Sequence, residues 1–295
     1  MSSSSLEAGW VRVVVDAASC AEPELAGIDA GLPAPGGAAV GRVVEAGEGA
    51  AHLVSRRVLV GPHQGCGECD LCRRARPHAC AAGALLGVTA PGALAGEVVA
   101  RARWALPLDG GLSLEGPLAA LIPREAADAY ALLARAGAGA GDRVAIRGSG
   151  PVARLAHALA RRRGVKSDDD GPAGALLVAG DDPRDLAAAA GAAGRGASLV
   201  VALARGDLAA GIAPASVAAL LAAGGALVGV PAAHPDLYPE VAALAVKGEL
   251  DLADAATVVS LEAPLADRPA LAALIRAALA HGRALVVNLS SHSES

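Results

Sequence analysis

The sequence has almost no aromatic side chains. Its 295 residues include no Phe, and the only aromatic rings belong to Trp10, Trp104, Tyr130 and Tyr238. Aromatic residues usually supply the largest buried areas of a core. This core must therefore be built from smaller side chains, chiefly Leu, Val and Ala, which fits the 54% share of apolar residues. A pocket that stacks its ligand between rings is disfavoured.

Long runs of one residue kind are also missing. No apolar stretch reaches the roughly 18–20 residues of a membrane span, and residues 1–8 lack the basic and then apolar order of a secretory signal. The formal charge is −5, and Arg161–Arg163 is the longest basic run, so nucleic-acid binding has no electrostatic footprint. These absences predict a cytoplasmic protein with neither membrane nor nucleic-acid partners.

Cysteine is scarce but clustered. Four of the five cysteines follow the spacing Cys66-x2-Cys69-x2-Cys72-x7-Cys80. Disulfides are disfavoured in the cytosol, where paired Cys-x-x-Cys motifs more often hold a metal. Four thiolates are a closed tetrahedral set for zinc, with no position left for water. The spacing predicts a structural zinc site that stabilises a loop without its own core; the alternative is four free or disulfide-bonded thiols.

Two patterns of predicted elements divide the chain. Short β-branched runs separated by Gly and Pro predict an antiparallel, barrel-like unit up to about residue 120. Alternating strands and helices then predict a parallel α/β sheet, and the acidic segment 166–174 predicts a surface insertion. The expected strands are 11–15, 39–45, 57–60, 96–101, 104–106, 143–146, 175–179, 199–203, 226–230 and 284–289, and the expected helices are 117–136, 153–163, 183–190, 214–223 and 268–280.

A glycine-rich loop joins the strand 143–146 to the following helix. Its glycines favour a tight turn and close approach to a pyrophosphate, which would lie at the helix N-terminus. The acid that binds ribose hydroxyls is predicted at Asp181 or Asp182, after the strand 175–179, and favours NAD over NADP. The alternative is a tight turn that binds nothing. The predicted cofactor-binding residues are Gly148, Ser149, Gly150, Pro151, Val152 and Asp181.

In combination, these features resemble the zinc-containing alcohol dehydrogenases of the medium-chain dehydrogenase/reductase superfamily. Val13–Cys20 is similar to the strand that ends at that family's first catalytic-zinc cysteine, and Gly41–Gly49 to a strand and turn of its GroES-like domain. The four-cysteine lobe has its structural-zinc spacing, and Gly141–Val152 looks like the entry to its Rossmann domain. The resemblance implies an α/β fold, with a GroES-like β-barrel catalytic domain over 8–123, a Rossmann domain over 124–255, and a return to the catalytic domain over 256–295.

The resemblance also shows where the sequence departs from the family. The first catalytic-zinc ligand is kept as Cys20, but Gly36-Gly37-Ala38 stands where the family has Gly-His-Glu, and Arg124 stands at the third ligand position. Arginine does not ligate zinc, and the nearby Glu22 and Glu24 would complete only a poor site. A catalytic zinc is therefore not expected. Between Asp182 and Leu199 the chain is also predicted to lack one strand of the family's usual Rossmann set, which predicts weaker adenosine binding.

Without a catalytic metal, the resemblance implies an NAD- or NADP-dependent oxidoreductase acting on a small molecule such as an aldehyde, ketone or activated alkene. The candidate catalytic residues are Cys20, Arg124 and Tyr130. Arg124 would hold an anionic or carbonyl oxygen, and Cys20 would act as proton donor or nucleophile if Arg124 lowered its pKa. A non-redox enzyme such as a lyase, and a catalytically inactive binding partner, remain open. The family's assembly implies a homodimer joined at the strand 226–230.

Overall fold

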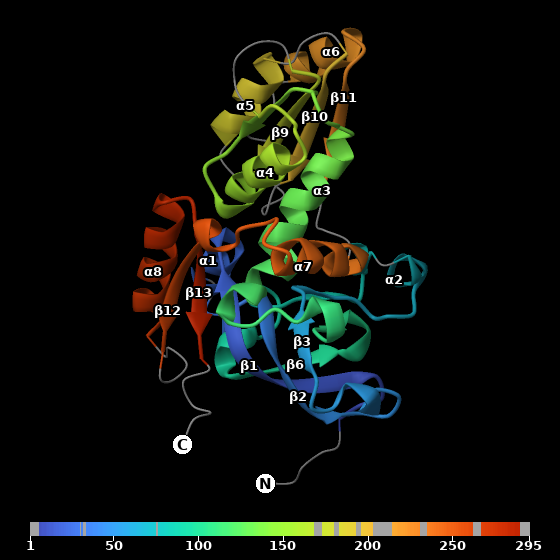
Figure 1. The fold of residues 1–295 in the computed structure, drawn as a ribbon, viewed down its shortest axis with the longest axis vertical. Helices are drawn as coiled ribbons and strands as arrows, with labels where there is room; N and C mark the ends of the chain where they lie inside the picture. Colours follow the sequence, from blue (N-terminus) through green and yellow to red (C-terminus); the bar gives the residue numbers. More distant parts are fainter. Residues whose placement is uncertain are drawn as a thin grey trace.

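The computed structural model describes residues 6–29, 31, 34–74, 76–167, 173–179, 183–192, 196–202, 214–230, 235–261 and 267–289. A seven-stranded sheet and a four-stranded sheet form its two main parts. Figure 1 shows the four-stranded sheet at the top, the larger sheet at the bottom, and helix α3 (Ala127–Ala136) running between them. No helix in the described ranges is long and apolar enough to cross a membrane.

The larger sheet is built around the long strand β1 (Trp10–Cys20), in which Val11, Val13 and Val15 are buried on one face. One edge of β1 pairs with β2. The other edge pairs with β6 along its first half and with β13 along its second half. The strand order is β12-β13-β1-β2-β3-β7, with bounds β2 (Ala38–Ala46), β3 (Arg57–Val60), β6 (Glu97–Arg101), β7 (Ala105–Pro107), β12 (Ala256–Ser260) and β13 (Ala284–Asn288).

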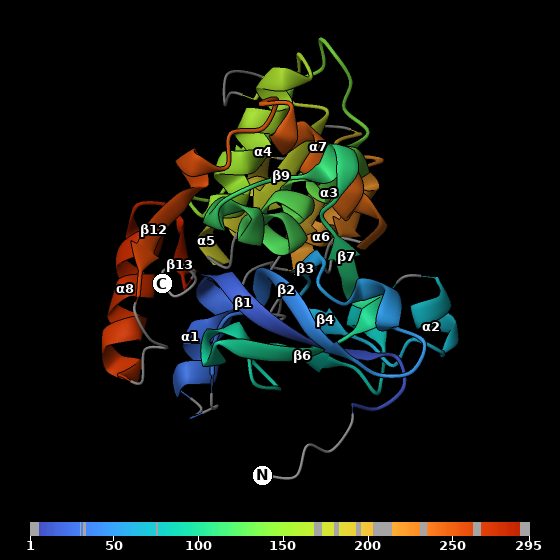
Figure 2. The same cartoon turned by 60° about the horizontal axis from the view of Figure 1, so that its bottom comes forward.

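The last described segment of the chain returns to this first sheet. Strand β13 pairs antiparallel with β1, and β12 pairs parallel with β13. Helix α8 (Arg268–Ala280) begins at Asp267, whose carboxylate accepts the N–H of Ala270 as an N-cap. The buried Leu271 and Ile275 attach it to the core of the sheet. In Figure 2 these elements lie beside β1 and α1 (Glu22–Asp29), whereas α2 (Asp70–Arg73) projects at the far side.

The smaller sheet is parallel, in the order β11-β10-β9-β8. Helices α3 and α4 contribute to the core on one face, and α5 and α6 to the core on the other. The bounds are β8 (Val144–Arg147), α4 (Pro151–Arg162), β9 (Ala175–Ala179), α5 (Pro183–Ala192), β10 (Ser198–Ala202), α6 (Pro214–Ala222) and β11 (Ala226–Gly229), with α7 (Tyr238–Val246) following. Because β9 and β10 are neighbours joined by α5, the strand expected to be missing between 182 and 199 is not missing there.

Most predicted elements are confirmed, and one differs informatively. The strands expected at 57–60 and 175–179 match β3 and β9, and those at 11–15 and 39–45 are parts of the longer β1 and β2. The single helix expected over 117–136 is instead a 3-10 turn (Pro117–Leu121), a π-helical turn (Ile122–Ala126) and then α3. Pro123 lies inside the π turn and cannot donate a helical N–H, which explains the break.

Candidate metal centre and dinucleotide loop

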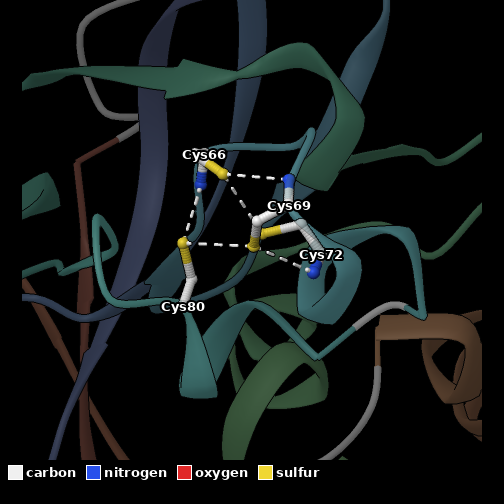
Figure 3. Close-up of side chains that lie close together, drawn as sticks. All are labelled: Cys66, Cys69, Cys72 and Cys80. Carbon is white, nitrogen blue, oxygen red and sulfur yellow. Dashed lines mark hydrogen bonds between the residues drawn. The ribbon is translucent and has the colours of Figure 1, made fainter.

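The four predicted zinc ligands converge in the lobe around α2. Their sulfur atoms all lie within 4.8 Å of one another, and Figure 3 shows the four side chains gathered in one place. Two of the separations are 3.9 Å (Cys66 to Cys72) and 3.8 Å (Cys69 to Cys80). A tetrahedral zinc with bonds of about 2.3 Å places its sulfur ligands about 3.8 Å apart. The donor set and its spacing therefore fit a structural zinc ion.

Backbone N–H groups of the same loop point at these sulfur atoms. The N–H of Cys69 donates to the sulfur of Cys66 at 3.3 Å, and that of Cys66 to the sulfur of Cys80 at 3.3 Å. The N–H groups of Glu68 and then Cys69 lower the pKa of Cys66 to about 6. At Cys66 these donors favour the thiolate, the form that binds zinc.

Trp104 and Arg103 support the lobe from outside. The indole N–H of Trp104 donates to the carbonyl of Gly65 at 3.1 Å, and its ring packs against the buried Cys72. The guanidinium of Arg103 donates to the carbonyls of Cys72 at 3.2 Å and of Gly67 at 3.3 Å. One of the few large side chains of this protein thus covers the metal lobe, and Arg103 brings positive charge to a site whose four thiolates exceed the charge of one zinc ion.

The resemblance assigns the ligands of a catalytic zinc to positions 20, 37 and 124. These positions also lie close together, but their side chains are not a set of metal ligands. Gly37 has no side chain, and a Cβ there would lie 2.6 Å from a carboxylate oxygen of Glu24 and 2.9 Å from Nη1 of Arg124. Glu24 accepts the N–H of Gly37 at 2.9 Å and that of Ala21 at 2.8 Å. Glu24 and Arg124 therefore fill the space that a ligand side chain at position 37 would need.

Arg124 is held from several directions. Its guanidinium forms an ion pair with Glu24, donates to Glu125 from Nη2 at 2.7 Å and from Nε at 2.9 Å, and approaches the hydroxyl of Ser19 at 3.2 Å. Its side chain is 11% exposed, and those of Glu24 and Glu125 are 0% and 1% exposed. The π turn presents the adjacent Arg124 and Glu125 to this interior together. A guanidinium and two carboxylates do not fit a zinc ion.

The buried cluster controls the charge of its neighbours. Burial, and then Glu24, raise the pKa of the Cys20 thiol well above its usual value, and the opposing effect of Arg124 is smaller. Arg124 does lower this pKa, but burial and Glu24 outweigh its effect, so Cys20 stays a protonated thiol at neutral pH. Burial also raises the pKa of Glu125, although Arg124 opposes it. A proton donor is compatible with Cys20, whereas a thiolate nucleophile is not.

Tyr130 makes its contacts elsewhere. Its hydroxyl donates to Glu240 on α7, and the guanidinium of Arg163, which follows α4, lies 4.3 Å from the ring centroid. Burial and the bond to Glu240 raise the pKa of the Tyr130 hydroxyl. These contacts join three helices and favour a structural role. Cys20 and Arg124 belong to one electrostatic cluster, whereas the partners of Tyr130 are other residues.

His63, which flanks the zinc cysteines in the sequence and is expected there to face solvent, is a neighbour of this buried cluster. It lies half-buried on β4 (His63–Gln64), with its ring edge-on to that of His78 at a centroid distance of 6.0 Å. Burial, and then the charges of His78 and Arg124, lower its pKa to about 4. The imidazole is therefore neutral at pH 7. The position of His63, three residues before the first zinc cysteine, does not predict its lowered pKa. The charged groups that lower it, His78 and Arg124, come from other segments of the chain.

The two glycines of the dinucleotide loop have different surroundings. Gly148 has φ of +119°, and a Cβ there would lie 2.3 Å from the carbonyl oxygen of Ala179. Its backbone conformation and its packing against β9 therefore require glycine, whether or not a ligand binds. Gly150 is the N-cap of α4 with φ of −82°, and a Cβ there would meet no atom within 4 Å. Neither conformation nor packing requires glycine at position 150. The open space at the N-terminus of α4 suits a bound phosphate group.

The remaining loop residues also have defined places. Ser149 is exposed, Pro151 and Val152 begin α4, and Ala153 is buried against the sheet. The turn between α8 and β13 packs on the loop, because a Cβ at Gly282 would lie 2.1 Å from the carbonyl oxygen of Ser149. Arg154, in the first turn of α4, donates to the carbonyl of His281 at 2.7 Å. Asp181 lies outside the described residues, and its ribose contact stays a prediction.

Comparison with known proteins agrees with this architecture. Residues 7–110 match the alcohol dehydrogenase GroES-like domain. L-Threonine 3-dehydrogenase from Coxiella burnetii is 34% identical over 128 residues, which cover 43% of this chain and 36% of that enzyme. The chain thus matches only about a third of the length of such relatives.

Solved structures are similar over nearly the whole chain. An alcohol dehydrogenase from Thermus sp. ATN1 has a TM-score of 0.79 at 19% identity, covering 98% of this chain and 95% of that one. A putative zinc-binding dehydrogenase from Sinorhizobium meliloti 1021 bound to NADP has a TM-score of 0.77 at 20% identity. The similarity covers 96% of this chain and 93% of that one.

The fold is therefore that of an alcohol dehydrogenase-like protein with a GroES-like part and a Rossmann-like parallel sheet. The described part of the chain also holds four cysteines grouped as a zinc site would need them, and over 128 residues the sequence is similar to that of a dehydrogenase.

Proposed function

We propose that this protein is an NAD(P)-dependent oxidoreductase of the alcohol dehydrogenase type, with a structural zinc ion and no catalytic zinc. The observation that carries the proposal is Gly150, the glycine of the β8–α4 loop that neither packing nor backbone conformation requires. A missing side chain beside a helix N-terminus is useful where a phosphate approaches the backbone. The NADP bound to the S. meliloti protein of the same fold supports this choice of ligand.

The loop residues Gly148–Val152 would contact the phosphate group, and Asp181 would contact a ribose. When bound, a nicotinamide cofactor supplies the hydride acceptor or donor. The protein's own contribution would come from the cluster of Cys20 and Arg124. Cys20 keeps its proton at neutral pH, and Arg124 supplies a fixed positive charge. Tyr130 would position α3 against α4 and α7 rather than contact substrate.

The test is calorimetric titration of the zinc-loaded protein with NADH and NADPH, in the wild type and two matched variants. Gly150→Ala puts a methyl group where the phosphate approaches, and should weaken binding at least about tenfold, or about 1.4 kcal/mol. Gly139→Ala is the control, because a Cβ there meets only one atom, at 3.8 Å, outside the loop. Unchanged affinity in Gly150→Ala, or no binding by the wild type, would contradict the proposal.

One observation favours a second candidate, a protein that binds its ligand without catalysis. Arg124 already forms ion pairs with the buried carboxylates of Glu24 and Glu125, so fewer of its N–H groups are available to a substrate oxygen. Cofactor binding without turnover of any aldehyde, ketone or activated alkene would support this candidate. Hydride transfer from bound cofactor to any of them would exclude it.

We also propose a homodimer in a reducing compartment such as the cytoplasm. Strand β11 is the last strand of the described parallel sheet, and three of its four residues are exposed. An unpaired, uncharged edge is a template for pairing with a second strand. Zinc-binding thiols are kept reduced in the cytoplasm.

A further inference from the structure

The two edges of strand β8 have very different neighbours. On one edge, β9 pairs with β8 in a continuous parallel register from Val144 to Arg147. On the other edge, within the described part of the chain, only Lys166 pairs, as an isolated parallel bridge. Its carbonyl accepts the N–H of Val144 at 2.8 Å, and its N–H donates to Asp142 at 2.9 Å. Lys166 is thus the remnant of a strand on the side of β8 opposite to β9.

The segment between Lys166 and β9 is too short to add a further parallel strand on that side. Residues 167–174 are all that separate Lys166 from the first residue of β9. A parallel crossover needs a dozen or more residues, usually with a helix. The chain therefore passes directly from the remnant to the opposite side of β8, and β9, β10 and β11 all follow on that side.

The helices confirm that the chain reverses direction at this point. Leu155 and Leu159 of α4 pack in the core that also holds α3, whereas Leu186 of α5 and Leu220 of α6 pack in the core on the other face of the sheet. Right-handed crossovers place helices on opposite faces when the strand order reverses. The structure thus keeps the switch point of a doubly wound sheet. Among the described residues, the half after the switch has the three strands β9, β10 and β11, and the half before it has only the bridge of Lys166 to Arg143.

In a complete sheet of this kind, each half binds one mononucleotide, and the strand after the glycine loop carries the acid for the adenosine ribose. We propose that this protein recognises only the nicotinamide mononucleotide half of a dinucleotide, so that reduced nicotinamide mononucleotide binds about as well as NADH. This inference rests on the proposed function, because it concerns the same glycine loop. The retained β8–α4 loop supplies the phosphate site, and the lost half removes the wall on which adenosine would lie.

The experiment titrates the full-length, zinc-loaded protein by calorimetry with reduced nicotinamide mononucleotide, NADH, NADPH and AMP. The dissociation constants of the first three should agree within about threefold, which is less than 1 kcal/mol, and AMP should not compete with NADH. NADPH is included because its extra phosphate is on the adenosine ribose. Gly150→Ala should weaken the mononucleotide and NADH by the same factor, and Gly139→Ala should change neither.

The possible failures are distinct. NADH binding about 100-fold or more tighter than the mononucleotide, or competition by AMP, would overturn this inference and leave the oxidoreductase proposal intact. Binding of neither nicotinamide compound would overturn both.

Discussion

Glu24 and Arg124, one hundred positions apart, form a buried ion pair, and the same carboxylate of Glu24 accepts the backbone N–H of Gly37. The resemblance to zinc-containing alcohol dehydrogenases assigns a metal ligand to each of the positions 37 and 124. Here a carboxylate and a guanidinium occupy that space, and the absent side chain of Gly37 makes room for them. At two positions that the resemblance assigns to metal ligands, the structure thus places a buried ion pair and the space that it fills.

Metal analysis should therefore find one zinc ion per chain. Cys69→Ser should lose that ion and lower the melting temperature by at least about 5 °C, because a structural zinc stabilises the folded lobe. Cys20→Ser is the matched control and should retain the full zinc content. Inductively coupled plasma mass spectrometry after gel filtration, with thermal unfolding, measures both. Two zinc ions in the wild type, one of them lost in Cys20→Ser, would show that the buried ion pair does not replace the metal.

Removing the cation of the buried cluster should be costly. Arg124→Met leaves two carboxylates in the interior without their partner, and breaking such a buried pair typically costs about 3–5 kcal/mol. The control is Arg12→Met, whose pair with Glu45 is partly exposed and should cost about 1 kcal/mol or less. Urea unfolding at pH 7 compares them. Adding Glu24→Gln and Glu125→Gln to Arg124→Met should recover most of the loss; equal costs for both single variants would contradict this account.

His63 should make stability depend on pH on the acid side. Its pKa is lowered from 6.5 to about 4 in the folded protein, so the unfolded chain takes up this proton first. The contribution of neutral His63 to the free energy of unfolding is fully present above pH 6.5. It is lost as the pH falls toward 4, which lowers the free energy of unfolding by about 2–3 kcal/mol. Urea unfolding between pH 7.5 and 4.5 should show a shallower fall in His63→Gln than in the wild type. The exposed His52→Gln should follow the wild type, and parallel curves for all three proteins would refute the assignment.

The proposed dimer can be tested at one N–H group. The N–H groups of Ala226 and Val230 donate toward β10, to the carbonyls of Ala197 and Val201. The N–H of Leu227, one residue along the strand, therefore faces the open edge. Leu227→Pro removes this outward donor and should turn a dimer into a monomer, as measured by light scattering. Leu227→Ala keeps the N–H and should remain dimeric. A monomeric wild type, or a dimer that tolerates the proline, would dismiss pairing at this strand.

The sequence predicted the local features better than the distant ones. The zinc site could be found from Cys66, Cys69, Cys72 and Cys80 because all four ligands come from one short loop. The pairing of Glu24 with Arg124 depends on the π turn and on the space at Gly37, and spacing carries no signal of either.

The topology of the parallel sheet shows the same limit. The apolar run of β9 predicted a strand, but nothing in the run shows which edge of β8 it joins. The useful signal was a length, the short segment between Lys166 and Ala175, which is too short to add a further helix and strand.

The pairing of β1 with β13 also sets an order of events during synthesis. Cys20 pairs with Leu285, so the outer edge of β1 beside its second half stays open until nearly all of the described chain has been made. The first sheet can begin to fold on the ribosome but cannot be completed there until β13 emerges, and loss of that last strand would expose the open edge to other chains.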